Sequence, residues 1–203
     1  MARYLLTHSL LSSWLYAMKD NPYEDATSER NAYDEFLRVL RKEPTETTEA
    51  MMNGIRFEGT VTAITRGAAD TNDPWYGAAS KIAAIVGGGP LQVKASKEIS
   101  VNGMTILLYG RLDSLKAGVI RDIKFSKGYD RGKYITSTQH PTYFEIVPEA
   151  IAFEYLVSNG TEVWTERYER ADTPSIIPII SDFLSWLREV GLMQVYQMHW
   201  EAK

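Results

Sequence analysis

The segment 109–126, YGRLDSLKAGVIRDIKFS, constrains the fold of this chain more than any other part of it. Both halves are apolar enough to form strands, and the link at Ala117 and Gly118 is a short turn with a glycine, so the segment predicts a β-hairpin. With that link as the loop, Asp113 and Asp122 lie at equal distances from the turn and face each other across the strands. Opposed side chains have Cβ atoms about 4.5–5.5 Å apart, a separation at which two like charges repel.

Lys124 joins these two acids on one face of the predicted hairpin. It lies two residues after Asp122, so both side chains point the same way, whereas Ile123 points to the other face. Two carboxylates and an ammonium group therefore converge, and a divalent cation is the simplest ligand that would make this patch favourable. The alternative is a solvated hairpin face on which the lysine neutralises one of the acids.

The composition predicts a soluble α/β protein of one domain. The chain has 203 residues, of which 44% are hydrophobic and 24% charged, so we expect a single domain over 1–203. No apolar run is long enough to cross a membrane and no signal-peptide pattern is present, so the expected location is the cytoplasm. The absence of cysteine excludes disulfides, thiolate zinc sites and cysteine-held iron–sulfur clusters. A net charge of −4 argues against general nucleic-acid binding, although a local basic groove would still permit it.

Hydrophobic periodicity predicts helices early in the chain and strands in its middle. A helical region at 1–66 is followed by a core at 81–157 and by a C-terminal hairpin and helix at 158–203. The expected helices are 3–18 (stopped by Asn21 and Pro22), 28–42, 46–65, 81–86, 137–147 and 179–190. The expected strands are 91–101, 104–114, 119–126, 151–157 and 162–168, with 67–80 as a loop. This order predicts an α/β fold in which a mixed sheet with an antiparallel meander is flanked by helices.

Glu58 lies on the third predicted helix at the spacing of a core-facing residue. It follows Met51 and Ile55 at i, i+4 and i+7, which places it on an apolar stripe. A carboxylate that faces a core needs a partner, because an unpaired buried charge is costly. The alternative is an acid at the edge of the stripe that either extends to solvent or pairs with Arg56 or Arg66.

Polar residues beyond the hairpin add to this pattern. Lys127 and Arg131 belong to a basic, glycine-containing loop that either is solvated or contacts phosphate. Gln139 and Tyr143 are one turn apart on the next predicted helix, so they share a face. His8 is expected to be a polar residue of the first helix rather than a ligand.

These motifs occur in a fixed order: an acid in GIRFE, then GRLD, then DIK, then QHPTY. The order resembles the PD-(D/E)XK nuclease superfamily, and within it the RecB-type exonucleases and their phage relatives. Their pattern is an acid or His on a helix, G-x-x-D, D-x-K and Q-x-x-x-Y. The opening THSLLSSWLY is also similar to the first helix of that family, and the resemblance covers residues 4–157. It implies a restriction-endonuclease-like core.

The resemblance implies a role for each residue that matches. Glu58, Asp113, Asp122 and the backbone carbonyl of Ile123 would bind Mg²⁺ or Mn²⁺, ions that prefer oxygen ligands. Lys124 would be the catalytic lysine and would act together with the two aspartates. The chain departs from many cellular members in having no cysteines for an iron–sulfur cluster, and it carries Glu58 where others have His.

The remaining matches concern the substrate. Gln139 and Tyr143 would steady the site and meet the DNA, with Lys127 and Arg131 nearby on the basic loop. The implied activity is a metal-dependent DNA nuclease, expected to be an exonuclease, in phage or cellular replication, recombination or repair. The alternative is a binding module of the same fold with weak catalysis, which holds DNA or a recombination or replication protein; an oligomer is compatible with either. A metal-dependent hydrolase of another substrate stays open but has no motif in its favour.

Overall fold

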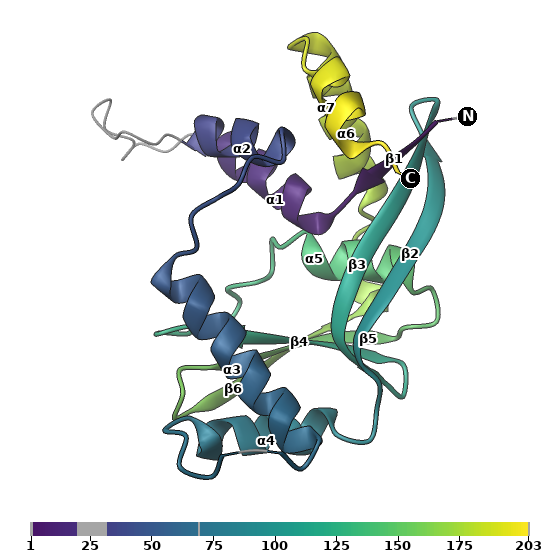
Figure 1. Ribbon diagram of the computed structural model, residues 1–203. Coiled ribbons are helices and arrows are strands. Elements are labelled where there is room, and N and C mark those ends of the chain that lie inside the picture. The colour runs from purple at the N-terminus through teal and green to yellow at the C-terminus, as the bar shows by residue number, and fades with distance from the viewer. Residues whose placement is uncertain (1, 20–31, 69, 203) are drawn as a thin grey trace.

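A computed structural model describes residues 2–19, 32–68 and 70–202 of the chain. The described part is a mixed α/β fold with a six-stranded sheet and helices on both faces, as the sequence predicts (Figure 1). The strands are β1 (Arg3–Leu6), β2 (Leu91–Val101), β3 (Met104–Lys116), β4 (Val119–Phe125), β5 (Ala152–Ser158) and β6 (Val163–Glu169). The helices are α1 (His8–Ala17), α2 (Ala32–Leu40), α3 (Glu49–Thr65), α4 (Tyr76–Val86), α5 (Gln139–Ile146), the short 3₁₀ helix η1 (Arg170–Asp172), α6 (Ile177–Glu189) and α7 (Met193–Trp200).

The long strand β3 joins two parts of the sheet. Its residues 104–114 pair with β2, from Val101↔Met104 to Leu91↔Ser114. On its other edge, β1 pairs in parallel with residues 105–108 and β4 pairs antiparallel with residues 114–116. Among the described residues, the stretch 109–113 therefore has a strand on one edge only. The sheet continues from β4 through a parallel pair with β5 to the edge strand β6.

The predicted two-residue loop at Ala117 and Gly118 is present, and a second such loop joins β2 to β3. Ala117 and Gly118 have φ of 51° and 73°, and Lys116 pairs with Val119 across them. Asn102 and Gly103 have φ of 50° and 75° in the β2–β3 hairpin. Two consecutive residues with positive φ form the turn whose twist matches that of antiparallel strands.

Side chains alternate between two cores on the two faces of the sheet. Phe153, Tyr155 and Val157 of β5 pack in the core that includes α5, whereas Leu156 packs in the core of α3 and α4. All seven residues of β5 are buried, as expected of a strand covered on both faces. In Figure 1, α3 crosses the sheet from the α1–α2 end toward α4.

The N-terminal residues differ from the sequence prediction. Arg3–Leu6 form strand β1 rather than the start of a helix, because they pair with the free edge of β3. The helix begins at His8, and the side chain of Thr7 caps it by accepting from the Leu10 N–H at 3.3 Å. The predicted stop at Asn21 and Pro22, and residues 28–31 of the second predicted helix, lie outside the described residues.

Two further helical segments depart from the prediction. α4 begins at Tyr76 instead of 81, where Ala78 and Ala79 pack against the core that contains Phe57. The helix α7 was not predicted, although Tyr196 and Trp200 are one turn apart and both are buried. No helix within the described ranges is both long enough and apolar enough to cross a membrane.

Candidate functional site

The candidate site lies where β3 and β4 separate. The last pair between these strands is Ser114↔Arg121, and the same register continued by one residue brings Asp113 opposite Asp122. Beyond that pair, the Ile123 N–H bonds to a side chain instead of a backbone carbonyl of β3: it donates to Asp113 Oδ2 at 2.8 Å. Asp113 and Asp122 are 8% and 5% exposed, so two acids are buried at one point of the sheet.

Asp122 is held by one residue of its own strand, Lys124, and by one residue of α5, Gln139. Lys124 Nζ lies 2.7 Å from Asp122 Oδ2, and the Gln139 amide donates to Asp122 Oδ1 at 2.5 Å. The Lys124 side chain is 33% exposed, so its ammonium group contacts both the buried acid and solvent. The structure therefore brings the predicted aspartate, lysine and glutamine together.

Gln92 is a residue that the sequence analysis missed. Its amide nitrogen donates to Glu58 Oε1 at 2.5 Å and to Asp113 Oδ1 at 3.1 Å, so one side chain connects α3 to β3. Gln92 lies opposite Asp113 in the β2–β3 ladder and has φ of +55°, a conformation that costs free energy in a residue other than glycine. No sequence pattern marks this role, because it depends on the approach of α3 to β2.

Glu58 faces the site, but the stripe on which it was placed does not face a core. Met51 and Ile55 are 49% and 67% exposed, and the buried residues of α3 are Phe57 and Val61. The helix turns its other side to α4, which leaves Met51 and Ile55 exposed. The alternative partners were also wrong, since among the described residues the Gln92 amide donates to Glu58, and Arg56 instead pairs with Asp73.

Burial and like charge act together on Asp113. Burial raises its pKa to about 7, and the Asp122 and Glu58 carboxylates add to that rise. The Ile123 N–H and Lys124 oppose it. A carboxyl group held this way carries unfavourable negative charge, which a cation would relieve.

Tyr143 explains why a glycine precedes Asp113. A Cβ atom at Gly110 would overlap the Tyr143 ring, so only glycine lets α5 approach β3 here. The Tyr143 hydroxyl donates to the Arg111 carbonyl at 3.2 Å, on the stretch where β3 has a strand on one edge only. Gln139 and Tyr143 are 4% and 3% exposed, which favours positioning of the site over direct contact with a substrate.

His8 also belongs to this neighbourhood. Its ring packs edge-on against that of Tyr143, with centroids 5.5 Å apart. Burial, followed by the nearby positive charge of Lys124, lowers the His8 pKa to about 4, although Asp122 acts in the opposite direction. His8 is therefore neutral at pH 7, and its position could not be foreseen because the residues around it are distant in sequence.

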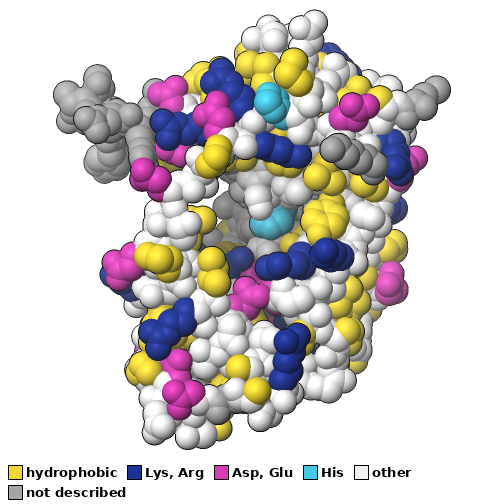
Figure 2. All heavy atoms as spheres, viewed as in Figure 1, with side chains coloured by type: hydrophobic (Ala, Val, Ile, Leu, Met, Phe, Trp, Pro, Cys, Tyr) yellow, Lys and Arg dark blue, Asp and Glu magenta, His cyan; other side chains and the backbone are white. Residues whose placement is uncertain are grey.

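Basic side chains lie beside the acids. A hollow of about 400 Å³ is lined by Glu58, Thr62, Arg66 and Arg111, and neither arginine has an ion pair with a described residue. This view of the molecule is hollowed near its middle, with Lys and Arg side chains at the rim (Figure 2). The three basic residues of the 127–133 loop are also exposed, namely Lys127, Arg131 and Lys133.

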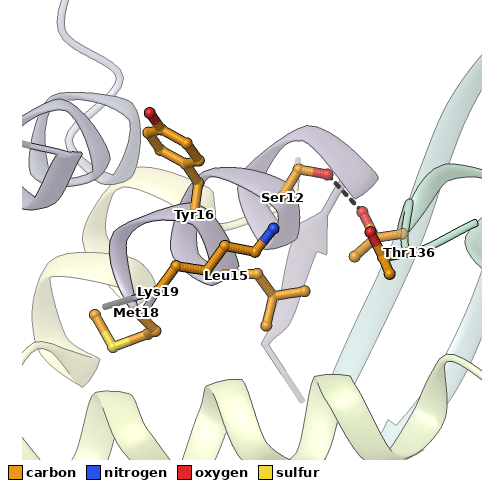
Figure 3. A pocket seen from close by; sticks show the side chains of 7 residues that line it. Ser12, Leu15, Tyr16, Met18, Lys19 and Thr136 are labelled. Atoms are coloured by element: carbon orange, nitrogen blue, oxygen red, sulfur yellow. Dashed lines mark hydrogen bonds between the residues drawn. The ribbon is translucent and has the colours of Figure 1, made fainter. Parts of the chain in front are cut away.

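A separate hollow beside α1 lacks the chemistry of the site. Ser12, Tyr16 and Lys19 line it together with Thr136 and Thr138, and no carboxylate is among its lining residues (Figure 3). Ser12 Oγ and Thr138 Oγ1 are 2.6 Å apart, and Thr138 donates to the His8 carbonyl at 3.0 Å. These bonds fix α1 to the segment that precedes α5.

The carboxylates of the site are ligands of the kind that a hard divalent cation prefers, but each already contacts a nitrogen donor of the protein. Carboxylate and carbonyl oxygens are the ligands that Mg²⁺ and Mn²⁺ prefer. In the described part of the chain, no three His, Asp or Glu side chains come close enough together to hold a metal ion. Gln92 lies between Glu58 and Asp113, and Lys124 neutralises Asp122. Asp113 and Asp122 are thus the pair best placed for a cation, with Glu58 joined to them through an amide.

Comparisons with known proteins bear on the fold alone. No family model and no curated protein matches the chain. Among solved structures, the crystal structure of SSO0001 is similar, with a TM-score of 0.53 at 13% identity, over 90% of this chain and 76% of that chain. An identity this low supports a shared fold and carries no conclusion about activity.

Proposed function

We propose that this protein is a metal-dependent DNA nuclease that hydrolyses phosphodiester bonds, with exonuclease action as the expected mode. The observation that carries the proposal is the convergence of Asp113, Asp122, Lys124 and Gln139 at the point where β3 and β4 separate. These residues come from three different elements, and no requirement of the hydrophobic core explains two buried acids there. The order of the motifs, which resembles that of PD-(D/E)XK nucleases, supports the same proposal.

The resemblance and the contacts of the residues together suggest a part for each. Asp113, Asp122 and the Ile123 carbonyl would hold Mg²⁺ or Mn²⁺, with Glu58 beside them. When bound, such an ion supplies a water of lowered pKa and neutralises phosphate charge. Lys124 is the one partly exposed cation in contact with the acids among the described residues, so it can reach a phosphate oxygen while it remains next to Asp122.

The surrounding residues hold this arrangement in place. The Gln139 amide fixes one oxygen of Asp122, and the Tyr143 ring seats α5 on Gly110. Arg66 and Arg111 offer positive charge beside the acids, so a DNA strand can approach despite the net charge of −4.

One observation favours a second candidate, a DNA- or protein-binding module with weak catalysis. Gln92 hydrogen-bonds Glu58 and Asp113, and Lys124 pairs with Asp122, so each acid has a protein partner without a cation. A decayed site would keep such internal contacts. The two candidates differ in whether cleavage occurs.

Digestion of end-labelled linear and circular DNA, single- and double-stranded, tests the proposal. Wild type with Mg²⁺, Mn²⁺ or EDTA is compared with Lys124→Ala and with Lys81→Ala, which removes an exposed lysine on α4. We expect metal-dependent loss of linear DNA, reduced on the order of 100-fold or more by Lys124→Ala and unchanged by Lys81→Ala. Cleavage of circles as well would make the protein an endonuclease. Binding of DNA without cleavage in any metal would establish the binding module.

A further inference from the structure

A second polar hollow lies at the edge of the sheet, beside strand β6. It has a volume of about 590 Å³ and is lined by Tyr129, Arg131, Trp164, Thr165, Glu166 and Arg167. Tyr129 and Trp164 stack with ring centroids 5.5 Å apart and an angle of 29° between the rings. Both rings are partly exposed, so an aromatic surface is open to a ligand.

The hollow combines this aromatic surface with free positive charge. Arg131 is exposed and has no ion pair with a described residue. Arg167 is different, because Glu154 and Glu169 already neutralise it, each with an oxygen within 2.7 Å. Arg131 is therefore the cation available to an anionic ligand.

Glu166 makes the loop that carries Tyr129 and Arg131 rigid. The carboxylate accepts from the Tyr129 hydroxyl at 2.5 Å, from the Gly132 N–H at 3.1 Å and from the Tyr134 N–H at 3.2 Å. The Tyr168 hydroxyl on β6 also donates to it. With so many donors, Glu166 is satisfied by protein groups and 7% exposed, so it presents little free charge to the hollow.

The strand register places the hollow on the same face of the sheet as the catalytic lysine. Lys124 pairs with Val157, and Val157 pairs with Trp164, so the three residues form one row across β4, β5 and β6. Residues paired across a sheet point to the same face. Two strand spacings separate Lys124 from Trp164, which is about 10 Å. A ligand in the hollow thus lies close to one held at Lys124.

We infer that this hollow is a subsite for an unpaired nucleotide of the DNA strand whose phosphate lies at Lys124. This inference rests on the proposed nuclease function. The base stacks on the exposed surface of the Tyr129–Trp164 pair, and Arg131 contacts the adjoining phosphate. A base within a duplex is already stacked on both sides, so the subsite selects DNA with unpaired nucleotides.

Binding in EDTA tests the subsite apart from catalysis. Fluorescence anisotropy of a labelled oligothymidine, and of a duplex of equal length, is measured with wild type and with Trp164→Ala, Trp164→Tyr and Arg131→Gln. Arg41→Gln, which removes an exposed arginine after α2, is the matched control for charge. We expect tighter binding of the single strand, weakened on the order of tenfold by Trp164→Ala and by Arg131→Gln. Trp164→Tyr should retain most of the affinity, since it keeps a ring, and Arg41→Gln should leave it unchanged.

The outcomes separate this inference from the nuclease proposal. If wild type cuts DNA while Trp164→Ala and Arg131→Gln bind the single strand as tightly as wild type, the subsite is wrong and the nuclease proposal stands. If no DNA is cut in Mg²⁺ or Mn²⁺ but the single strand binds through Trp164 and Arg131, the subsite stands without catalysis. Arg131 is exposed, so its variant decides the matter even if Trp164→Ala fails to fold.

Discussion

Gln92 determines how the acids are held when no cation is bound. Its single amide nitrogen serves both Glu58 and Asp113, at 2.5 and 3.1 Å. We expect Gln92→Ala to lower the free energy of unfolding in EDTA by about 1–3 kcal/mol, because the acids lose their shared donor. Urea denaturation in EDTA measures this loss. Mn²⁺ should restore stability more in the variant than in wild type, since binding to the folded state alone stabilises it.

Gln92→Gly separates the lost hydrogen bonds from the backbone conformation. It also lacks the amide, but glycine adopts the φ of +55° without strain. We expect this variant to be more stable than Gln92→Ala by about 1 kcal/mol. Equal stability of wild type and Gln92→Ala in EDTA would show that the amide does not stabilise the acids.

The GRLD and QHPTY motifs meet where α5 packs on β3, with Gly110 against the Tyr143 ring. Gly110→Ala places a methyl group against the Tyr143 ring, so α5 must shift and carry Gln139 away from Asp122. We expect a loss of about 1–3 kcal/mol in stability, measured by thermal denaturation, as for an overpacked core. The proposed nuclease activity should fall as well. Gly54→Ala is the matched control, because nothing lies within 4 Å of its new methyl group. Inside the exposed part of α3 that change should stabilise instead, by about 0.5–1 kcal/mol.

The 127–133 loop depends on Glu166 for its shape, and this dependence should vary with pH. Burial alone would raise the Glu166 pKa, but the Tyr129 and Tyr168 hydroxyls and the N–H groups of Tyr134 and Gly132 hold it below its usual range. A lowered pKa in the folded state stabilises the protein above the unfolded pKa of about 4.3, and that stability is lost as the pH falls through the folded value. We expect Glu166→Gln to be less stable than wild type at pH 7 by about 1–3 kcal/mol. Melting temperatures from pH 7 to pH 3 should show the difference narrowing below about pH 4; a constant difference would mean that ionisation of Glu166 is not involved.

Across the whole molecule, local patterns predicted the elements that local chemistry determines. The Asn102–Gly103 and Ala117–Gly118 turns fix the register of the meander, and that register brings Asp113 toward Asp122 as expected. The strand at Arg3–Leu6 could not be predicted in this way, because its partner is a free edge about 100 residues later in the chain. The same limit applies to Gln92 and His8. Each reaches the site through contacts between elements, and no spacing in the sequence records such contacts.

Because the net charge is −4, the proposed binding of DNA depends on where the positive charges lie. Arg66 and Arg111 lie beside the acids. Arg38, in the last turn of α2, pairs with Glu35. Arg41, which follows that helix, pairs with Glu43. Replacing either pair of arginines by glutamine changes the net charge equally. If binding depends on local charge, only the Arg66→Gln/Arg111→Gln variant weakens it.

The salt dependence of binding measures this effect directly. For single strands, the slope of log K against log [salt] is about −0.7 per phosphate neutralised, so loss of two contacts should reduce the slope by about 1.4. Anisotropy titrations in EDTA at several salt concentrations give the slopes for both double variants and for wild type. We expect the Arg38→Gln/Arg41→Gln slope to equal that of wild type. Equal losses in the two variants would instead mean that the overall charge of the molecule governs the approach of DNA, and that the hollow beside Glu58 is not in its path.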